Sequence, residues 1–123
     1  MPHVPLRAVA LVGVGGALGT LARHGVVTGL GEDGGLPSGT LLVNLLGSLL
    51  IGVVVAAVAS NAWRQSLATG FLGGFTTYSA LAVQTRELLV TDPPIAVGYV
   101  LATLAGGWFL ALLGLAIGRR WVR

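Results

Sequence analysis

The sequence lacks several side chains on which enzyme and metal sites depend. It has no cysteine, which excludes disulfides, thiolate metal sites and cysteine nucleophiles. It has no lysine, and its two histidines, His3 and His24, are too few for a histidine-rich metal site. Charged residues make up 9% of the chain, against about 25% in an ordinary soluble domain. Because 54% of its 123 residues are hydrophobic, more than a soluble fold of this size can bury, the composition excludes a soluble enzyme and indicates a membrane protein.

Long stretches without charge divide the chain into apolar segments. A membrane-spanning helix needs about 20 mostly apolar residues. The sequence therefore predicts an all-α membrane protein, a single domain over 1–123 with four transmembrane helices at 6–29, 38–60, 66–90 and 95–117. The first segment has some features of a signal peptide, but its apolar character resumes after Arg23 and no clear cleavage site is present, so we expect it to be retained.

Glycine is abundant, with 20 residues in the chain. Several glycines have a small residue four positions away, as Gly70 and Gly74 do, and such pairs let membrane helices approach closely. They are explained either by packing within the bundle or by self-association. Because four short helices enclose little interior, we expect an oligomer.

The second segment carries a polar stripe. Thr40, Asn44, Ser48 and Gly52 recur every four residues, so they share one helix face. An asparagine at membrane depth needs a partner or water. Two roles stay open: a hydrogen bond between helices, or a polar track for a solute. Amide N–H and hydroxyl donors suit a small anion as well as water.

The third segment contains the sequence GFLGGFTTYS at 70–79, which is rich in poor helix formers. It predicts a helix broken mid-membrane, and such breaks free backbone carbonyls that can coordinate a cation. The alternative is a continuous helix with a glycine-rich packing face. Near the end of the first segment, Arg23 either extends to the membrane interface or gives a vestibule a positive potential that attracts anions.

The positions of the acids narrow the function further. None of the four acids lies mid-span, whereas proton-coupled transporters rely on an intramembrane carboxylate or histidine. No phosphate-binding loop or catalytic dyad is present. The net charge of +3 is interpreted as charge flanking membrane helices rather than as a nucleic-acid surface. A passive channel needs none of the missing groups, and the pattern favours one.

Three segments match signature sequences of one family, in order and at the right spacing. Residues 15–24 (GGALGTLARH) are similar to GGxxGAxxRY, 39–48 (GTLLVNLLGS) to GTLxVNxxGS, and 70–79 to GFxGGxTTFS. The chain thus resembles the Fluc (CrcB) fluoride channels. The resemblance implies a passive channel in the cell membrane that lets cytoplasmic fluoride out and limits its toxicity. It also implies an antiparallel dimer of four-helix subunits with two narrow pores.

The resemblance assigns pore roles to individual residues. The family's pore asparagine falls on Asn44 and its vestibule arginine on Arg23. A pore-lining threonine and serine fall on Thr40 and Ser79, and the first of two pore phenylalanines falls on Tyr78. These assignments agree with a polar track and an anion-attracting arginine.

The resemblance also implies a structural sodium ion that is not transported. It would be held at the dimer centre by the backbone carbonyls of Gly73 and Thr76. The sequence departs from the family at Leu81, where the second pore phenylalanine is expected, and at Gln84, where a glutamate is usual. The aromatic lining is therefore incomplete in this subunit. The fourth segment carries no signature, and its polar candidates are Tyr99 and Thr103.

The arginines are distributed unevenly between the two sides of a four-span topology. One side, with both termini and the 61–65 turn, holds five of the seven: Arg7, Arg64, Arg119, Arg120 and Arg123. The other side holds Arg23 and Arg86 with all four acids, Glu32, Asp33, Glu87 and Asp92. The positive-inside rule then predicts cytoplasmic termini.

The uneven distribution of arginine also bears on which subunit the chain pairs with. A subunit that pairs antiparallel with itself inserts both ways, so its bias should be near zero. We therefore expect an antiparallel heterodimer with an oppositely oriented paralogue, which would supply the groups missing at Leu81 and Gln84, with one fully formed pore. The alternative is a dual-topology homodimer.

Two functions from other classes stay open. One is a small multidrug-type transporter, also four-helical and dimeric, although such transporters carry a first-helix carboxylate that this chain lacks. The other is a non-conducting assembly subunit of a membrane complex. Fluoride efflux from liposomes separates all three.

Overall fold

The computed structural model describes residues 4–31 and 35–122. In this part of the chain the regular elements are all helical, and they form four rods. Of the residues used above in the charge distribution, Glu32, Asp33 and Arg123 lie outside the described ranges. The elements are α1 (Leu6–Leu30), α2 (Ser38–Ala57), α3 (Asn61–Arg64), η1 (Gln65–Leu72), α4 (Gly73–Phe75), α5 (Tyr78–Thr91) and α6 (Pro93–Trp121).

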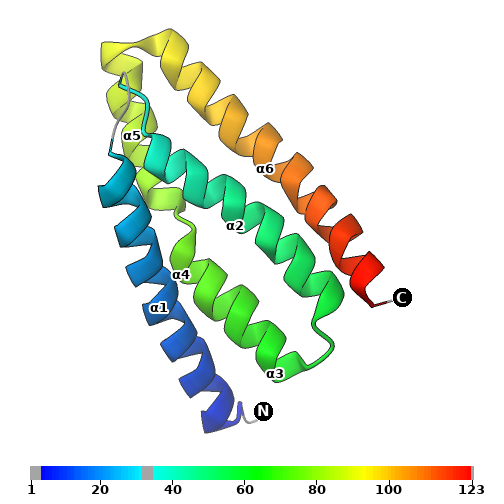
Figure 1. Cartoon of the computed structure of the whole chain (residues 1–123). Coiled ribbons are helices and arrows are strands. Elements are labelled where there is room, and N and C mark those ends of the chain that lie inside the picture. Colours follow the sequence, from blue (N-terminus) through cyan, green and yellow to red (C-terminus); the bar gives the residue numbers. More distant parts are fainter. Residues whose placement is uncertain (1–3, 32–34, 123) are drawn as a thin grey trace.

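The four rods run up and down through the molecule (Figure 1). Helix α1 is the first, α2 the second and α6 the fourth, and α3, η1, α4 and α5 together form the third. Both termini and α3 lie at one end, and the α1–α2 and α5–α6 connections lie at the other. Helices α1, α2 and α6 are each long and apolar enough to cross a membrane. The third rod is divided into shorter pieces, so no single helix within it reaches that length.

The rods differ from the expected spans mainly at their ends. Helix α2 stops at Ala57, and the chain is helical again from Asn61, so the turn lies at 58–60 rather than at the expected 61–65. Helix α6 begins at Pro93, because the Asp92 side chain accepts a hydrogen bond from the Ile95 N–H and proline fits the first helical position. Terminal turns of this kind carry no apolar periodicity.

Glycines let the rods pack closely within the subunit. A methyl group on Gly114 of α6 would overlap the Leu49 carbonyl oxygen of α2. A methyl group on Gly19 of α1 would likewise overlap the Phe71 carbonyl oxygen of η1. These two glycines therefore serve packing inside the bundle, which agrees with the first of the two explanations.

The surface of the subunit is strongly apolar. Trp108 is 70% exposed and Val90 84%, whereas Thr40 and Asn44 are buried. In a soluble domain large apolar side chains are mostly buried and polar ones exposed, and this subunit shows the reverse pattern. It agrees with a protein whose outer faces contact lipid or another subunit.

Candidate functional site

The third rod is interrupted between α4 and α5. Helix α4 ends at Phe75, Thr76 and Thr77 have extended backbone, and α5 begins at Tyr78. We call Thr76 and Thr77 the interruption. The Thr76 hydroxyl and N–H both donate to the Leu72 carbonyl, at 2.9 Å and 3.0 Å. The Thr77 hydroxyl accepts from the Ala80 N–H at 3.2 Å and so caps α5.

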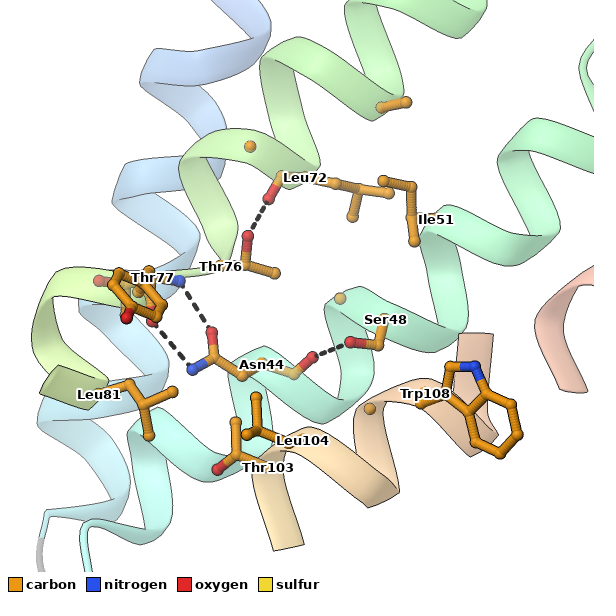
Figure 2. Close-up of a pocket in the computed structure, with 15 residues that line it drawn as sticks. Asn44, Ser48, Ile51, Leu72, Thr76, Thr77, Leu81, Thr103, Leu104 and Trp108 are labelled. Atoms are coloured by element: carbon orange, nitrogen blue, oxygen red, sulfur yellow. Dashed lines mark hydrogen bonds between the residues drawn. The ribbon is translucent and has the colours of Figure 1, made fainter. Parts of the chain in front are cut away.

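Side chains from two other rods hold the peptide unit that joins Thr76 to Thr77. Arg23 Nη1 of α1 donates to the Thr76 carbonyl at 3.0 Å. The Thr77 N–H donates to Asn44 Oδ1 of α2 at 2.8 Å, and Asn44 Nδ2 donates back to the Thr77 carbonyl at 3.0 Å (Figure 2). Polar backbone groups released from the helix are thus satisfied by side chains, as an apolar surrounding requires.

Asn44 makes hydrogen bonds between rods. This is the first of the two roles that the sequence left open for it. Its side chain is 8% exposed, and its carboxamide bonds both backbone groups of Thr77. The carboxamide nitrogen carries two hydrogens, and one bond from Nδ2 is made within the described residues. The second hydrogen leaves Asn44 able to donate to an anion as well.

Two hollows meet at the interruption, and Thr77 lines both. The asparagine groove, of about 390 Å³, is lined by Asn44, Gly73, Thr76 and Tyr78 among others (Figure 2). The arginine groove, of about 580 Å³, contains the remaining predicted pore residues Arg23, Thr40 and Ser79, together with His24, Gln84 and Glu87. The structure therefore divides the five predicted pore residues between two adjoining hollows.

The two positions of the expected aromatic pair have different surroundings. Tyr78 is 80% exposed, so its own subunit does not enclose the ring. Leu81 is 7% exposed and packs in a cluster with Leu88, Ala96 and Tyr99, although it also reaches the asparagine groove. Residue 81 thus belongs largely to the subunit core.

A partly buried polar pair links α5 to α6. The Tyr99 hydroxyl donates to Gln84 Oε1 at 2.8 Å, and Tyr99 is 1% exposed. Thr103, the other polar candidate of the fourth segment, donates to the carbonyl of Tyr99 in its own helix at 2.8 Å. The sequence did not predict this pairing. The one sign of it in the sequence is that Gln84 and Tyr99 are polar side chains within apolar helices.

The carbonyls assigned to sodium can be tested against the structure. In a continuous helix the Gly73 carbonyl would accept from the Thr77 N–H, but that N–H donates to Asn44. The Thr76 carbonyl accepts from Arg23 and has a second lone pair. The described residues contain no cluster of acids and histidines that could hold a metal ion. Gly73 and Thr76 therefore fit a monovalent cation held by carbonyl oxygens, with Arg23 sharing one of them.

Comparison with known proteins places this chain in a family. The sequence model described as CrcB-like protein, Camphor Resistance (CrcB), matches residues 10–115. A Gloeobacter violaceus protein named fluoride-specific ion channel FluC is 46% identical over 83% of this chain and 88% of its own. A Bordetella bronchiseptica protein of the same name is 44% identical over 100% and 99% of the two chains. A Bacillus subtilis protein named fluoride-specific ion channel FluC 2 is 39% identical over 94% and 90%. The chain belongs to the CrcB family.

Proposed function

We propose that this chain is a subunit of a passive, fluoride-specific ion channel in the cell membrane, which lets cytoplasmic fluoride out and limits its toxicity. The observation that carries the proposal is similarity over nearly the whole chain to proteins named fluoride-specific ion channel FluC. The channel catalyses no reaction.

The residues of the two grooves suit a small, strongly hydrated anion. Arg23 places a positive charge in the arginine groove, which Glu87 also lines, and draws anions towards its own end of the groove. Hydroxyl donors at Thr40 and Ser79, the amide of Asn44 and the hydroxyl of Tyr78 then replace the water around the ion. A narrow path lined by donors favours fluoride over larger anions.

The working unit is an obligate antiparallel dimer, with the interruption at mid-depth in the membrane. Thr76 and Thr77 lie near the middle of the third rod, between Asn61 and Thr91. The exposed ring of Tyr78 and the exposed Gly73 beside the asparagine groove support a second subunit that completes the pore there. A structural sodium ion between the subunits would contact the Gly73 and Thr76 carbonyls and supply positive charge where the helices are interrupted.

The favoured partner is an oppositely oriented paralogue, and the termini are cytoplasmic. In the described part of the chain, Arg7, Arg119 and Arg120 lie in the end turns of α1 and α6, at the end of the molecule that also carries α3 with Arg64 (Figure 1). This concentration of arginine supports a fixed orientation. The alternative is a homodimer of dual topology.

Fluoride efflux tests the function directly. Purified protein is reconstituted in liposomes loaded with potassium fluoride, and external fluoride is followed with an electrode after valinomycin is added. A channel releases fluoride and retains chloride in a parallel chloride-loaded sample. A multidrug-type transporter would instead move organic cations against a proton gradient, and an assembly subunit would move neither. Protein-free liposomes are the control.

A further inference from the structure

We propose that Asn44 is the positioning residue of the interruption: its carboxamide holds the Thr77 N–H away from the Gly73 carbonyl and so keeps that carbonyl open to a monovalent cation. The inference rests on the proposed function, to which the sodium ion belongs. It gives Asn44 a role towards the cation that is separate from donation to fluoride.

Two consecutive N–H groups locate the point at which the helix stops. The Thr76 N–H keeps its helical bond to the Leu72 carbonyl, four residues earlier, at 3.0 Å. The next N–H, that of Thr77, would continue the pattern by bonding the Gly73 carbonyl. It donates to Asn44 Oδ1 at 2.8 Å instead. Helical hydrogen bonding therefore ends at the N–H that Asn44 takes.

The local sequence does not by itself forbid a continuous helix here. Neither Thr76 nor Thr77 is proline, and threonine, although a poor helix former, costs less in a helix than glycine or proline does. The positive-φ residues of the described chain are Gly31 and Gly35, both far from the interruption. No residue at the interruption is confined to a non-helical backbone, so contacts hold it open: the Thr77 hydroxyl, which caps α5, and partners outside the third rod, Asn44 and Arg23.

Asn44 is placed for this task by close approach of α2 to the interruption. A methyl group on Gly47, one turn along α2, would overlap the Thr76 side-chain methyl group, so glycine here leaves room for the interruption to lie against α2. The short Asn44 side chain then reaches both the N–H and the carbonyl of Thr77 (Figure 2). With both groups held, Thr77 cannot turn its N–H back into the helix.

The test compares sodium stabilisation of the protein and its variants. Thermal unfolding in detergent is measured in sodium chloride and in N-methylglucamine chloride at equal ionic strength. Bound sodium should raise the midpoint of the wild-type protein by roughly 5 °C. Asn44→Leu should lose this rise, because the Thr77 N–H is then available to the Gly73 carbonyl. Asn44→Asp keeps an oxygen acceptor for that N–H and should keep the rise.

Ser66→Ala is the matched control. The Ser66 hydroxyl also makes a buried side-chain bond between rods, to the Leu11 carbonyl at 3.0 Å, and Ser66 is 8% exposed like Asn44. It lies outside both grooves. Ser66→Ala should lower the midpoint in both salts and leave the sodium rise unchanged, which separates general loss of packing from loss of the cation site.

The outcomes are distinct. Sodium stabilisation retained by Asn44→Leu, lost by Asn44→Asp, or absent from the wild-type protein overturns the inference. If Asn44→Leu does not fold, Asn44→Asp decides alone. Fluoride efflux is measured on the same preparations, and Asn44→Asp should conduct at least tenfold less because a carboxylate repels the anion. Wild-type protein that shows the expected sodium pattern but no efflux would support the role of Asn44 and contradict the fluoride-channel function.

Discussion

Arg23 and Thr76 lie 53 positions apart in the chain, yet Arg23 Nη1 donates a 3.0 Å hydrogen bond to the Thr76 carbonyl at the interruption. Hydrogen bonds from charged donors contribute about 1.5–3 kcal/mol each. The same side chain lines the arginine groove, where we propose that its charge attracts anions. One side chain thus holds the interrupted backbone and also places a positive charge in the groove.

These two tasks of Arg23 separate on substitution. Arg23→Gln removes the charge, and we expect fluoride efflux at low ionic strength to fall about tenfold or more. The loss should shrink as salt is raised, because screening reduces the attraction in the wild-type protein too. Arg23→Lys keeps the charge and should retain most of the efflux. Equal efflux by Arg23→Gln and wild type at every salt concentration would show that Arg23 does not attract the ion.

Two glycines of α6, Gly114 and Gly98, should respond differently to replacement by alanine, as measured by the stability of the fold. A methyl group on Gly114 would overlap the Leu49 carbonyl of α2, a rigid backbone neighbour, so Gly114→Ala should destabilise the fold by about 1–3 kcal/mol. Gly98 has no atom within 4 Å of an added methyl group. Gly98→Ala should leave stability unchanged or raise it by up to about 1 kcal/mol, as expected for a helical glycine. Unfolding in a graded detergent series measures both, and equal effects would contradict the close packing of α2 on α6.

The bond from Tyr99 to Gln84 predicts an energetic coupling between α5 and α6. Tyr99→Phe removes the donor and leaves the Gln84 oxygen without it, at a cost of about 1–3 kcal/mol. In a double-mutant cycle, the loss of stability in Tyr99→Phe with Gln84→Leu should be about 1 kcal/mol smaller than the sum of the losses in the two single variants. Thr91→Val supplies the control, because Thr91 bonds the Glu87 carbonyl of its own helix and should combine additively with Tyr99→Phe. Additivity in both cycles would count against the Tyr99–Gln84 bond.

The sequence predicted the parts of this fold that depend on composition and on short-range patterns. The apolar segments are evident because few charges interrupt them, and the extended Thr76 and Thr77 lie in the stretch that is richest in poor helix formers. The depth of this interruption in a membrane stays a prediction. The resemblance also singled out Arg23 and Asn44, both of which contact the interruption.

The partners of these residues could not be predicted, for a physical reason. Asn44 and Thr77 are 33 positions apart, and their bonds depend on how closely α2 approaches the third rod. Gly47 leaves room for that approach, and its neighbours are known only once the rods are packed. The distribution of the predicted pore residues over two grooves likewise follows from packing. The ends of α2 and α6 were missed because turns and caps carry no apolar periodicity.

The last prediction concerns the orientation of the chain in the membrane. A C-terminal tag should be accessible from the cytoplasm alone, because the end of the molecule with both termini carries Arg7, Arg64, Arg119 and Arg120, whereas Arg23 and Arg86 lie towards the other (Figure 1). In the favoured heterodimer the chain expressed alone should insert one way and release fluoride poorly. Co-expression with an oppositely oriented paralogue should restore efflux. As a control, Arg119→Glu with Arg120→Glu reduces the arginine bias from five against two to three against two and should make the tag partly accessible from both sides. Tags equally accessible on both sides of the wild-type protein, with full efflux from the chain alone, would instead establish a dual-topology homodimer.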